Sequence, residues 1–258
     1  MSYFSREDYF IRVARGLVPK QTVLNKYGCS TNVDSGIVTD IWDPANATDD
    51  LDNLEYLTTA DLMVVQSTNA VDDDTGTGMQ TMRIIGLDAS WNEISEDVAL
   101  QTAGVTTTKS FIRVYRAYGL TYGSGGVNAG DISIIDDGGV AATPQAQINT
   151  GKGQTLMALY TVPATHTLIL THYYASILKS SAGASDIQLL SRLDADTATA
   201  GWRVRHYNAV HSTGGTYTRH DLMGGLKLPP KTDVRMTANG SAPNLTVMGG
   251  FGGILIEN

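Results

Sequence analysis

The residues best suited to chemistry in this sequence are five histidines in its second half: His166, His172, His206, His211 and His220. Gly214-Gly215 lies between two apolar and aromatic segments and predicts a two-residue hairpin turn. In that hairpin His211 faces Thr218. His220 faces Ala209, so the imidazoles are kept apart. A metal centre built from these residues would need ligands from another subunit, and we expect none within one chain.

Three consecutive carboxylates at residues 72–74 precede Gly76 and could begin a calcium-binding loop, since closely spaced carboxylates at a bend suit a hard cation. Arg83 stands where such a loop needs a bidentate glutamate. We therefore expect a solvated acidic turn at residues 72–74.

Catalytic motifs are absent from the sequence. It contains no G-x-S-x-G, H-E-x-x-H or C-x-x-C pattern, and the glycine triplets at 76–78 and 151–153 lack the further residues of nucleotide-binding loops. Cys29 is the only cysteine, which excludes an intrachain disulfide and a cysteine-based metal site. These features predict a non-enzymatic protein without a cofactor.

The composition favours short strands joined by tight turns. Charged residues make up 17% of the 258 residues, and the chain contains 27 glycines. The net charge of −8 disfavours nucleic acid, because phosphate binding needs clustered Lys and Arg. No apolar run is long enough for a membrane helix, and the first residues do not resemble a signal peptide. We expect neither nucleic acid nor a membrane as a partner.

The N-terminal segment has the only pattern in the sequence that predicts a helix. Ser5 and Asp8 resemble a capping box, and Gly16 and Pro19 end the segment. Its apolar positions have helical spacing and are Phe10, Val13, Ala14 and Leu17. Arg12 and Arg15 lie around them in an otherwise acidic protein. The helix either folds onto its own domain or serves as an arm that docks on a neighbouring acidic subunit.

The rest of the chain predicts an all-β fold of two tandem β-sandwich (jelly-roll-like) domains, preceded by the short helix and an extended arm. Residues 1–60 form the helix and connector arm, 61–150 the first sandwich and 151–258 the second. Apolar runs between turn signals predict strands at 62–65, 82–87, 111–116, 132–135, 156–160, 167–177, 187–193, 202–210, 216–222, 234–237 and 245–256.

Several segments resemble a family of virion structural proteins from tailed bacteriophages. They lie at residues 9–16 (YFIRVARG), 25–28 (NKYG), 40–43 (DIWD), 76–78 (GTG), 84–88 (IIGLD), 123–126 (GSGG), 128–132 (NAGDI), 154–163 (QTLMALYTVP) and 229–234 (PPKTDV). Thr165 departs from the family, which usually has Gly in that turn. The resemblance spans nearly the whole chain, and it implies a virion component without catalytic residues to carry over.

Together these observations predict a capsid decoration, cement or head-fibre subunit, assembled in the host cytoplasm and located in the virion. Its expected partners are copies of itself, as a trimer or another symmetric oligomer, and the major capsid protein or other virion proteins. The N-terminal arm would bind the shell. The residues expected to make assembly contacts are Phe10, Arg12, Val13, Arg15, Leu17 and Trp42.

Two alternatives remain open. A tail-fibre, baseplate or receptor-binding subunit would expose an aromatic, glycan-binding face on the second domain, around Trp202 and Tyr207. A carbohydrate-active enzyme or glycan-binding module is a third hypothesis, although no paired acids can be placed in space from the sequence.

Overall fold

The computed structural model describes residues 9–42, 53–138, 144–178, 183–212 and 217–258. Strands account for 57% of the structure and helix for 3%. The named strands pair antiparallel in small sheets, so the all-β prediction is confirmed. No helix among the described residues is long and apolar enough to cross a membrane.

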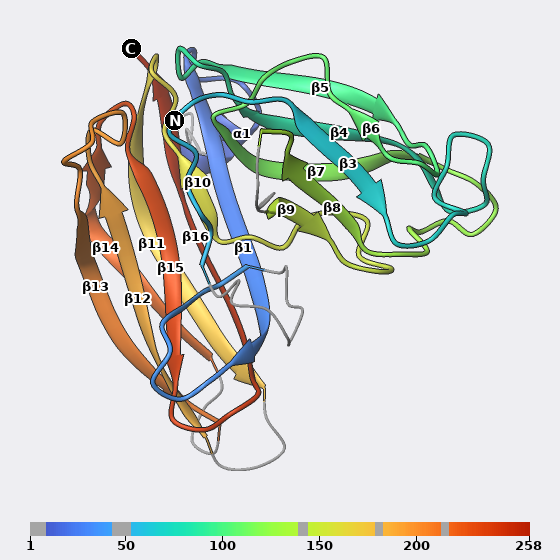
Figure 1. The fold of residues 1–258 in the computed structure, drawn as a ribbon. Coiled ribbons are helices and arrows are strands. Elements are labelled where there is room, and N and C mark those ends of the chain that lie inside the picture. Colours follow the sequence, from blue (N-terminus) through green and yellow to red (C-terminus); the bar gives the residue numbers. More distant parts are fainter. Residues whose placement is uncertain (1–8, 43–52, 139–143, 179–182, 213–216) are drawn as a thin grey trace, which may run out of the picture.

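Two sheets on one side of the molecule share a hydrophobic core (Figure 1). The first sheet has the order β1 (Gln21–Val33), β16 (Leu245–Glu257), β11 (His166–Leu178) and β14 (Tyr217–Leu228). The second has the order β10 (Leu159–Thr161), β15 (Asp233–Gly240), β12 (Ala184–Arg192) and β13 (Trp202–His211). The short β2 (Thr39–Asp40) pairs with β15 beyond the end of β10. We call these two sheets the rolled unit.

The pairing in the rolled unit follows a simple rule. Of its eight main strands in chain order, the first pairs with the last (β1 with β16) and the third with the sixth (β11 with β14) in the first sheet. The second pairs with the seventh (β10 with β15) and the fourth with the fifth (β12 with β13) in the other sheet. This is the connectivity of one long antiparallel hairpin that has been rolled up, so successive hairpin pairs alternate between the sheets.

The remaining strands form a second unit with its own core, which projects to one side in Figure 1. One sheet has the order β6 (Val105–Thr106), β3 (Met63–Ser67), β8 (Ile132–Asp136) and β9 (Pro144–Ile148). The other has the order β5 (Glu93–Ala99), β4 (Met79–Leu87) and β7 (Arg113–Tyr122). In sequence this unit lies between β2 and β10, so we call it the inserted unit.

The predicted extended arm at residues 20–60 is wrong for β1 and β2, which are strands of the rolled unit. β1 pairs with β16 over most of its length. The two units are therefore nested in the sequence, because strands on both sides of the inserted unit complete the rolled one. β1 was not predicted as a strand because one of its faces packs on backbone and therefore shows no alternation of apolar side chains. At Gly28, for example, a Cβ would lie 2.1 Å from the carbonyl oxygen of Ile41.

Helix α1 (Tyr9–Ala14) has only six residues and lies against β1. It ends where predicted: Gly16 adopts a φ of 69°, a left-handed conformation that favours glycine, and donates its N–H to the carbonyl of Val13. The capping residues predicted at Ser5 and Asp8 lie outside the described residues.

Candidate functional site

Helix α1 presents an apolar patch to solvent. Val13 is 2% exposed and anchors the helix, whereas Phe10 and Leu17 are 40% and 49% exposed. Tyr9 and Ile11 extend the patch, at 47% and 51% exposure. Of the residues predicted to make assembly contacts, Phe10 and Leu17 are thus exposed, and Val13 is buried.

The patch lies in a positively charged segment. Arg12 and Arg15, also predicted assembly residues, are exposed on and just after α1. Residues 9–33 contain four Lys or Arg and no Asp or Glu, in a protein of net charge −8. Three of the four, Arg12, Arg15 and Lys20, are exposed, so the surface of this segment is positively charged.

Beside the helix, the outer face of the first sheet is hollowed. A depression of about 700 Å³ is lined by residues that include Phe10, His172 and Met223, whose side chain is 96% exposed. The glycines of β16 leave room for rings on β11: Gly252 pairs with His172, and a Cβ on Gly252 would lie 2.7 Å from that imidazole. The α1 patch and this hollow form one continuous surface, which we call the assembly face.

Trp42, the sixth predicted assembly residue, is not on this surface. It is 3% exposed and belongs to the hydrophobic core of the inserted unit. The prediction that Trp42 makes assembly contacts is therefore wrong, because its side chain is buried in this core and not exposed to a partner.

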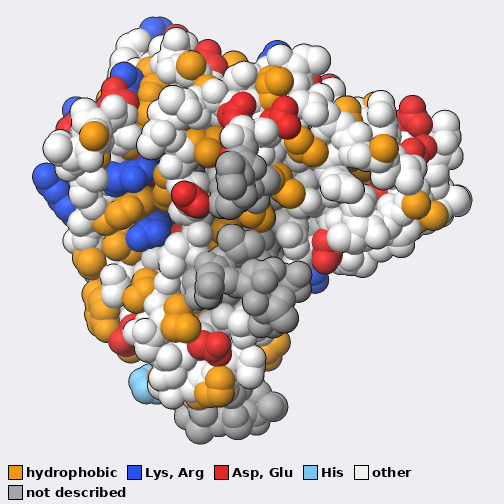
Figure 2. All heavy atoms as spheres, in the orientation of Figure 1, with side chains coloured by type: hydrophobic (Ala, Val, Ile, Leu, Met, Phe, Trp, Pro, Cys, Tyr) orange, Lys and Arg blue, Asp and Glu red, His pale blue; other side chains and the backbone are white. Residues whose placement is uncertain are grey.

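A feature that the sequence did not predict lies where the two units meet. Arginine and aromatic side chains alternate there, with each guanidinium carbon 4.1–5.1 Å from the centre of the neighbouring ring. In order, the members of this arginine ladder are Trp91, Arg113, Tyr56, Arg192, Trp202 and Arg235. Figure 2 shows Lys and Arg side chains beside hydrophobic ones over the upper parts of β12, β13 and β15.

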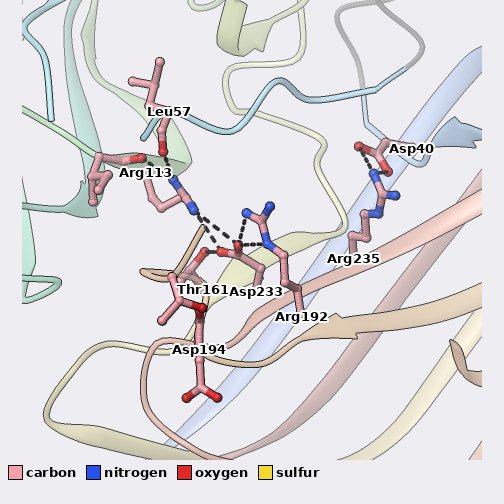
Figure 3. A network of polar contacts seen from close by, with 10 residues as sticks. Asp40, Leu57, Arg113, Thr161, Arg192, Asp194, Asp233 and Arg235 are labelled. Atoms are coloured by element: carbon pink, nitrogen blue, oxygen red, sulfur yellow. Dashed lines mark hydrogen bonds and ion pairs between the residues drawn. The ribbon is translucent and has the colours of Figure 1, made fainter. Parts of the chain in front are cut away.

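Asp233 is the centre of the ladder's polar contacts (Figure 3). Its fully buried carboxylate accepts hydrogen bonds from Arg113 Nε at 3.1 Å, Arg192 Nε at 2.9 Å and Thr161 Oγ1 at 2.6 Å. Since Arg113 belongs to the inserted unit and the other partners to the rolled unit, Asp233 joins the two by charge-assisted bonds.

The second carboxylate of the ladder is Asp40, whose Oδ1 lies 3.1 Å from Arg235 Nη1. Desolvation raises the pKa of Asp40 to about 6, although Arg235 opposes this shift. Burial also raises the pKa of the Tyr56 hydroxyl well above its ordinary value. The buried oxygen of that hydroxyl has no hydrogen-bond partner among the described residues. The three guanidiniums of the ladder are thus paired with two carboxylates, Asp233 and Asp40.

Lys26 makes another contact between the units. Its ammonium group is buried and donates a hydrogen bond to the carbonyl of Tyr115 in β7. Desolvation, followed by the nearby charge of Arg116, lowers the pKa of Lys26 to about 7.

The structure overturns the predicted separation of the histidines. The rings of His206 and His220 lie 4.9 Å apart, and each is about 5 Å from the ring of Tyr173. The prediction failed because β13 and β14 do not pair as a hairpin: each belongs to a different sheet, and the two edges meet over Tyr173. The predicted turn at 214–215 lies outside the described residues. Among those described, no three His, Cys, Asp or Glu side chains group as a metal site.

The prediction of a solvated acidic turn at residues 72–74 is wrong for Asp72, whereas Asp74 is exposed and Asp73 partly exposed. Asp72 is 1% exposed, and its carboxylate accepts hydrogen bonds from the backbone N–H groups of Met79, Ala129 and Gly130. This carboxylate holds two loops of the inserted unit together.

Comparison with known proteins shows no matching family model and no matching curated protein. A solved structure of infectious bursal disease virus, Gt strain, has 11% identity and a TM-score of 0.25, covering 96% of this chain and 78% of that one. The Gx strain has 10% identity and a TM-score of 0.21, covering 96% and 76%. The VP2 subviral particle of the same virus has 12% identity and a TM-score of 0.16, covering 97% and 77%. The chain is thus only weakly similar to these viral proteins, and the predicted bacteriophage family is not shown.

Proposed function

We propose that this chain is a non-enzymatic structural component of a virus particle and acts in several copies. The observation that carries the proposal is the assembly face, an exposed apolar surface on a β-rich body. The rolled order of eight strands supports it, since this is the connectivity of a jelly roll, a fold common in virus capsids. That second argument is an analogy of fold, because jelly rolls also occur in lectins.

The specific role we propose is a capsid decoration, cement or head-fibre subunit, as a trimer or another symmetric oligomer. The assembly face would contact copies of the chain or an acidic surface of the shell. Apolar side chains would supply the buried area, and Arg12 and Arg15 would supply electrostatic steering. Repetition by symmetry would then strengthen a modest individual contact.

Substitution on the assembly face tests the proposal better than truncation. Deleting residues 1–50 would remove β1 and β2 and so damage the rolled unit. We therefore choose Phe10→Ser with Leu17→Ser, both of which change exposed side chains. Val127→Ser in the inserted unit is the matched control, because Val127 is 46% exposed and is part of neither α1 nor the lining of the hollow.

We expect the wild-type chain and the control to form the same oligomer in mass photometry, and the double variant to shift toward monomer. In particles from the native source, antibody against this chain should label the surface in electron microscopy. A wild-type monomer absent from particles would refute the proposal. Labelling restricted to the tail would favour a fibre, baseplate or receptor-binding subunit over capsid decoration.

A further inference from the structure

We infer that a cleft beside the arginine ladder binds a small carboxylate, either on a sugar or as a free organic acid. The cleft has a volume of about 640 Å³ and opens between the two units. Trp91 and Arg113 of the inserted unit line it, as do Arg192 and residues 195–198 and 200 of the rolled unit. Junctions between units are a common location for ligand sites.

The charged groups in and behind the walls favour an anion, and of these Arg113 and Arg192 line the cleft itself. Asp233 is shared between Arg113 and Arg192, while Asp40 pairs with Arg235. These five groups retain one net positive charge in a largely buried setting, where an uncompensated charge is costly. At the rim, Asp196 and Lys231 neutralise each other at 2.7 Å.

One donor is placed to receive that anion. Arg113 uses Nε and Nη2 on Asp233 and Nη1 on the carbonyls of Leu57 and Ile112. Arg192 uses only Nε and Nη2 on Asp233. Its Nη1 has no acceptor among the described residues, and its side chain is 18% exposed and lines the cleft. A carboxylate at Arg192 Nη1 would form a charge-assisted hydrogen bond.

The remaining surface suits the body of a small organic molecule. Trp91 and Tyr56 contribute ring surfaces, and the buried Tyr56 hydroxyl lacks a partner in the same wall. Ala89, Ala195 and Ala198 also line the cleft, and their small side chains leave room for a ligand. Because guanidiniums cover both faces of the Tyr56 ring, a sugar ring or a short aliphatic chain would lie against the ring edges and the small side chains of the cleft while its acid group contacts Arg192.

Titration of the full chain at constant ionic strength tests this inference, by calorimetry or by NMR of the tryptophan indoles. The probes are glucuronate, acetate and neutral glucose. We expect glucuronate to bind and glucose not to bind. Arg192→Met should weaken glucuronate binding by about ten-fold or more, because it removes a charged hydrogen bond but keeps the stem. Arg203→Met, an exposed arginine outside the cleft, should leave binding unchanged.

A second variant separates loss of the site from loss of the fold. Ala198 is exposed on the cleft loop, so Ala198→Trp should fill the cleft without touching the ladder. It should abolish binding while the melting temperature stays at the wild-type value. Acetate binding as tight as glucuronate would assign recognition to the carboxylate alone, and tighter glucuronate would assign it to an acidic sugar. Equal binding of glucose, full affinity in either variant, or no binding of either acid would overturn the inference.

Discussion

Replacing Asp233 by Asn should strongly destabilise the protein. The asparagine has nearly the same shape, but it removes the negative charge that Arg113 and Arg192 share. Asp233 is fully buried, and the side chain of Arg113 is only 4% exposed. Removing one partner from a buried ion pair costs about 3–5 kcal/mol, because the other partner stays buried without its counter-charge. Arg192 is 18% exposed and can be partly hydrated, so we expect the lower end of this range.

Thermal unfolding followed by circular dichroism measures the effect. For a chain of this length, about 3 kcal/mol corresponds to a fall in melting temperature of roughly 6–12 °C. Asp97→Asn is the matched control: Asp97 pairs with Arg83 at 2.5 Å, but the two side chains are 52% and 38% exposed. Exposed pairs contribute only about 0–1 kcal/mol, so the control should barely change the melting temperature. If the two variants melted within a degree or two of each other, Asp233 would not be the electrostatic centre of the joint.

Two further substitutions test the packing of β1. The pKa of Lys26 is about 7 in the folded protein and 10.5 as its ordinary value, so the folded chain binds fewer protons in between and stability should rise with pH from 7 to 10.5. This rise in the free energy of unfolding is at most about 5 kcal/mol, and Lys26→Met should abolish it. Urea unfolding across this pH range measures the effect. If the free energy of unfolding of the variant rose with pH as steeply as that of the wild type, the assigned burial of Lys26 would be contradicted. Gly250→Ala should destabilise by about 1–3 kcal/mol, since its Cβ would lie 2.3 Å from the carbonyl oxygen of Lys26. Gly201→Ala, which has nothing within 4 Å of its Cβ, should not; equal melting temperatures would refute the close packing.

Strands that alternate between core and outer face could be predicted from the sequence almost to the residue. The segments at 167–177 and 245–256 correspond to β11 and β16: buried and partly exposed residues largely alternate along β11, and β16 is a nearly continuous buried run in its middle. Periodicity gave no such signal for β1. On one edge β1 pairs with the glycines of β16, and Gly28 packs on backbone. β1 can therefore pack closely only because these glycines have no side chains.

The joint could not be predicted because its members come from distant parts of the sequence. Asp233 and Arg113 are 120 positions apart, and no local spacing relates them. A weak signal was present in charged residues within apolar segments, as at Arg113 and Arg192, where a charge inside a predicted strand requires a partner. The partner's identity depends on which strands become neighbours. The predicted arrangement of two tandem domains gave the wrong neighbours, because the two units are nested in the sequence.

The nesting also explains why the joint contains charged contacts beside its apolar ones, to which Leu87, Ile112 and Tyr115 contribute by packing into the core of the rolled unit. Only two stretches of chain connect the inserted unit to the rolled one, before β3 and after β9, so the connections alone would leave a hinge. Apolar contact tolerates sliding, whereas the bonds from Arg113 to Asp233 and from Lys26 to the Tyr115 carbonyl each have one geometry. Opening the hinge would separate buried charges from their partners, which costs far more than exposing an equal apolar area. The ladder therefore fixes the angle between the units, and the symmetric assembly proposed above would require that angle to be the same in every copy.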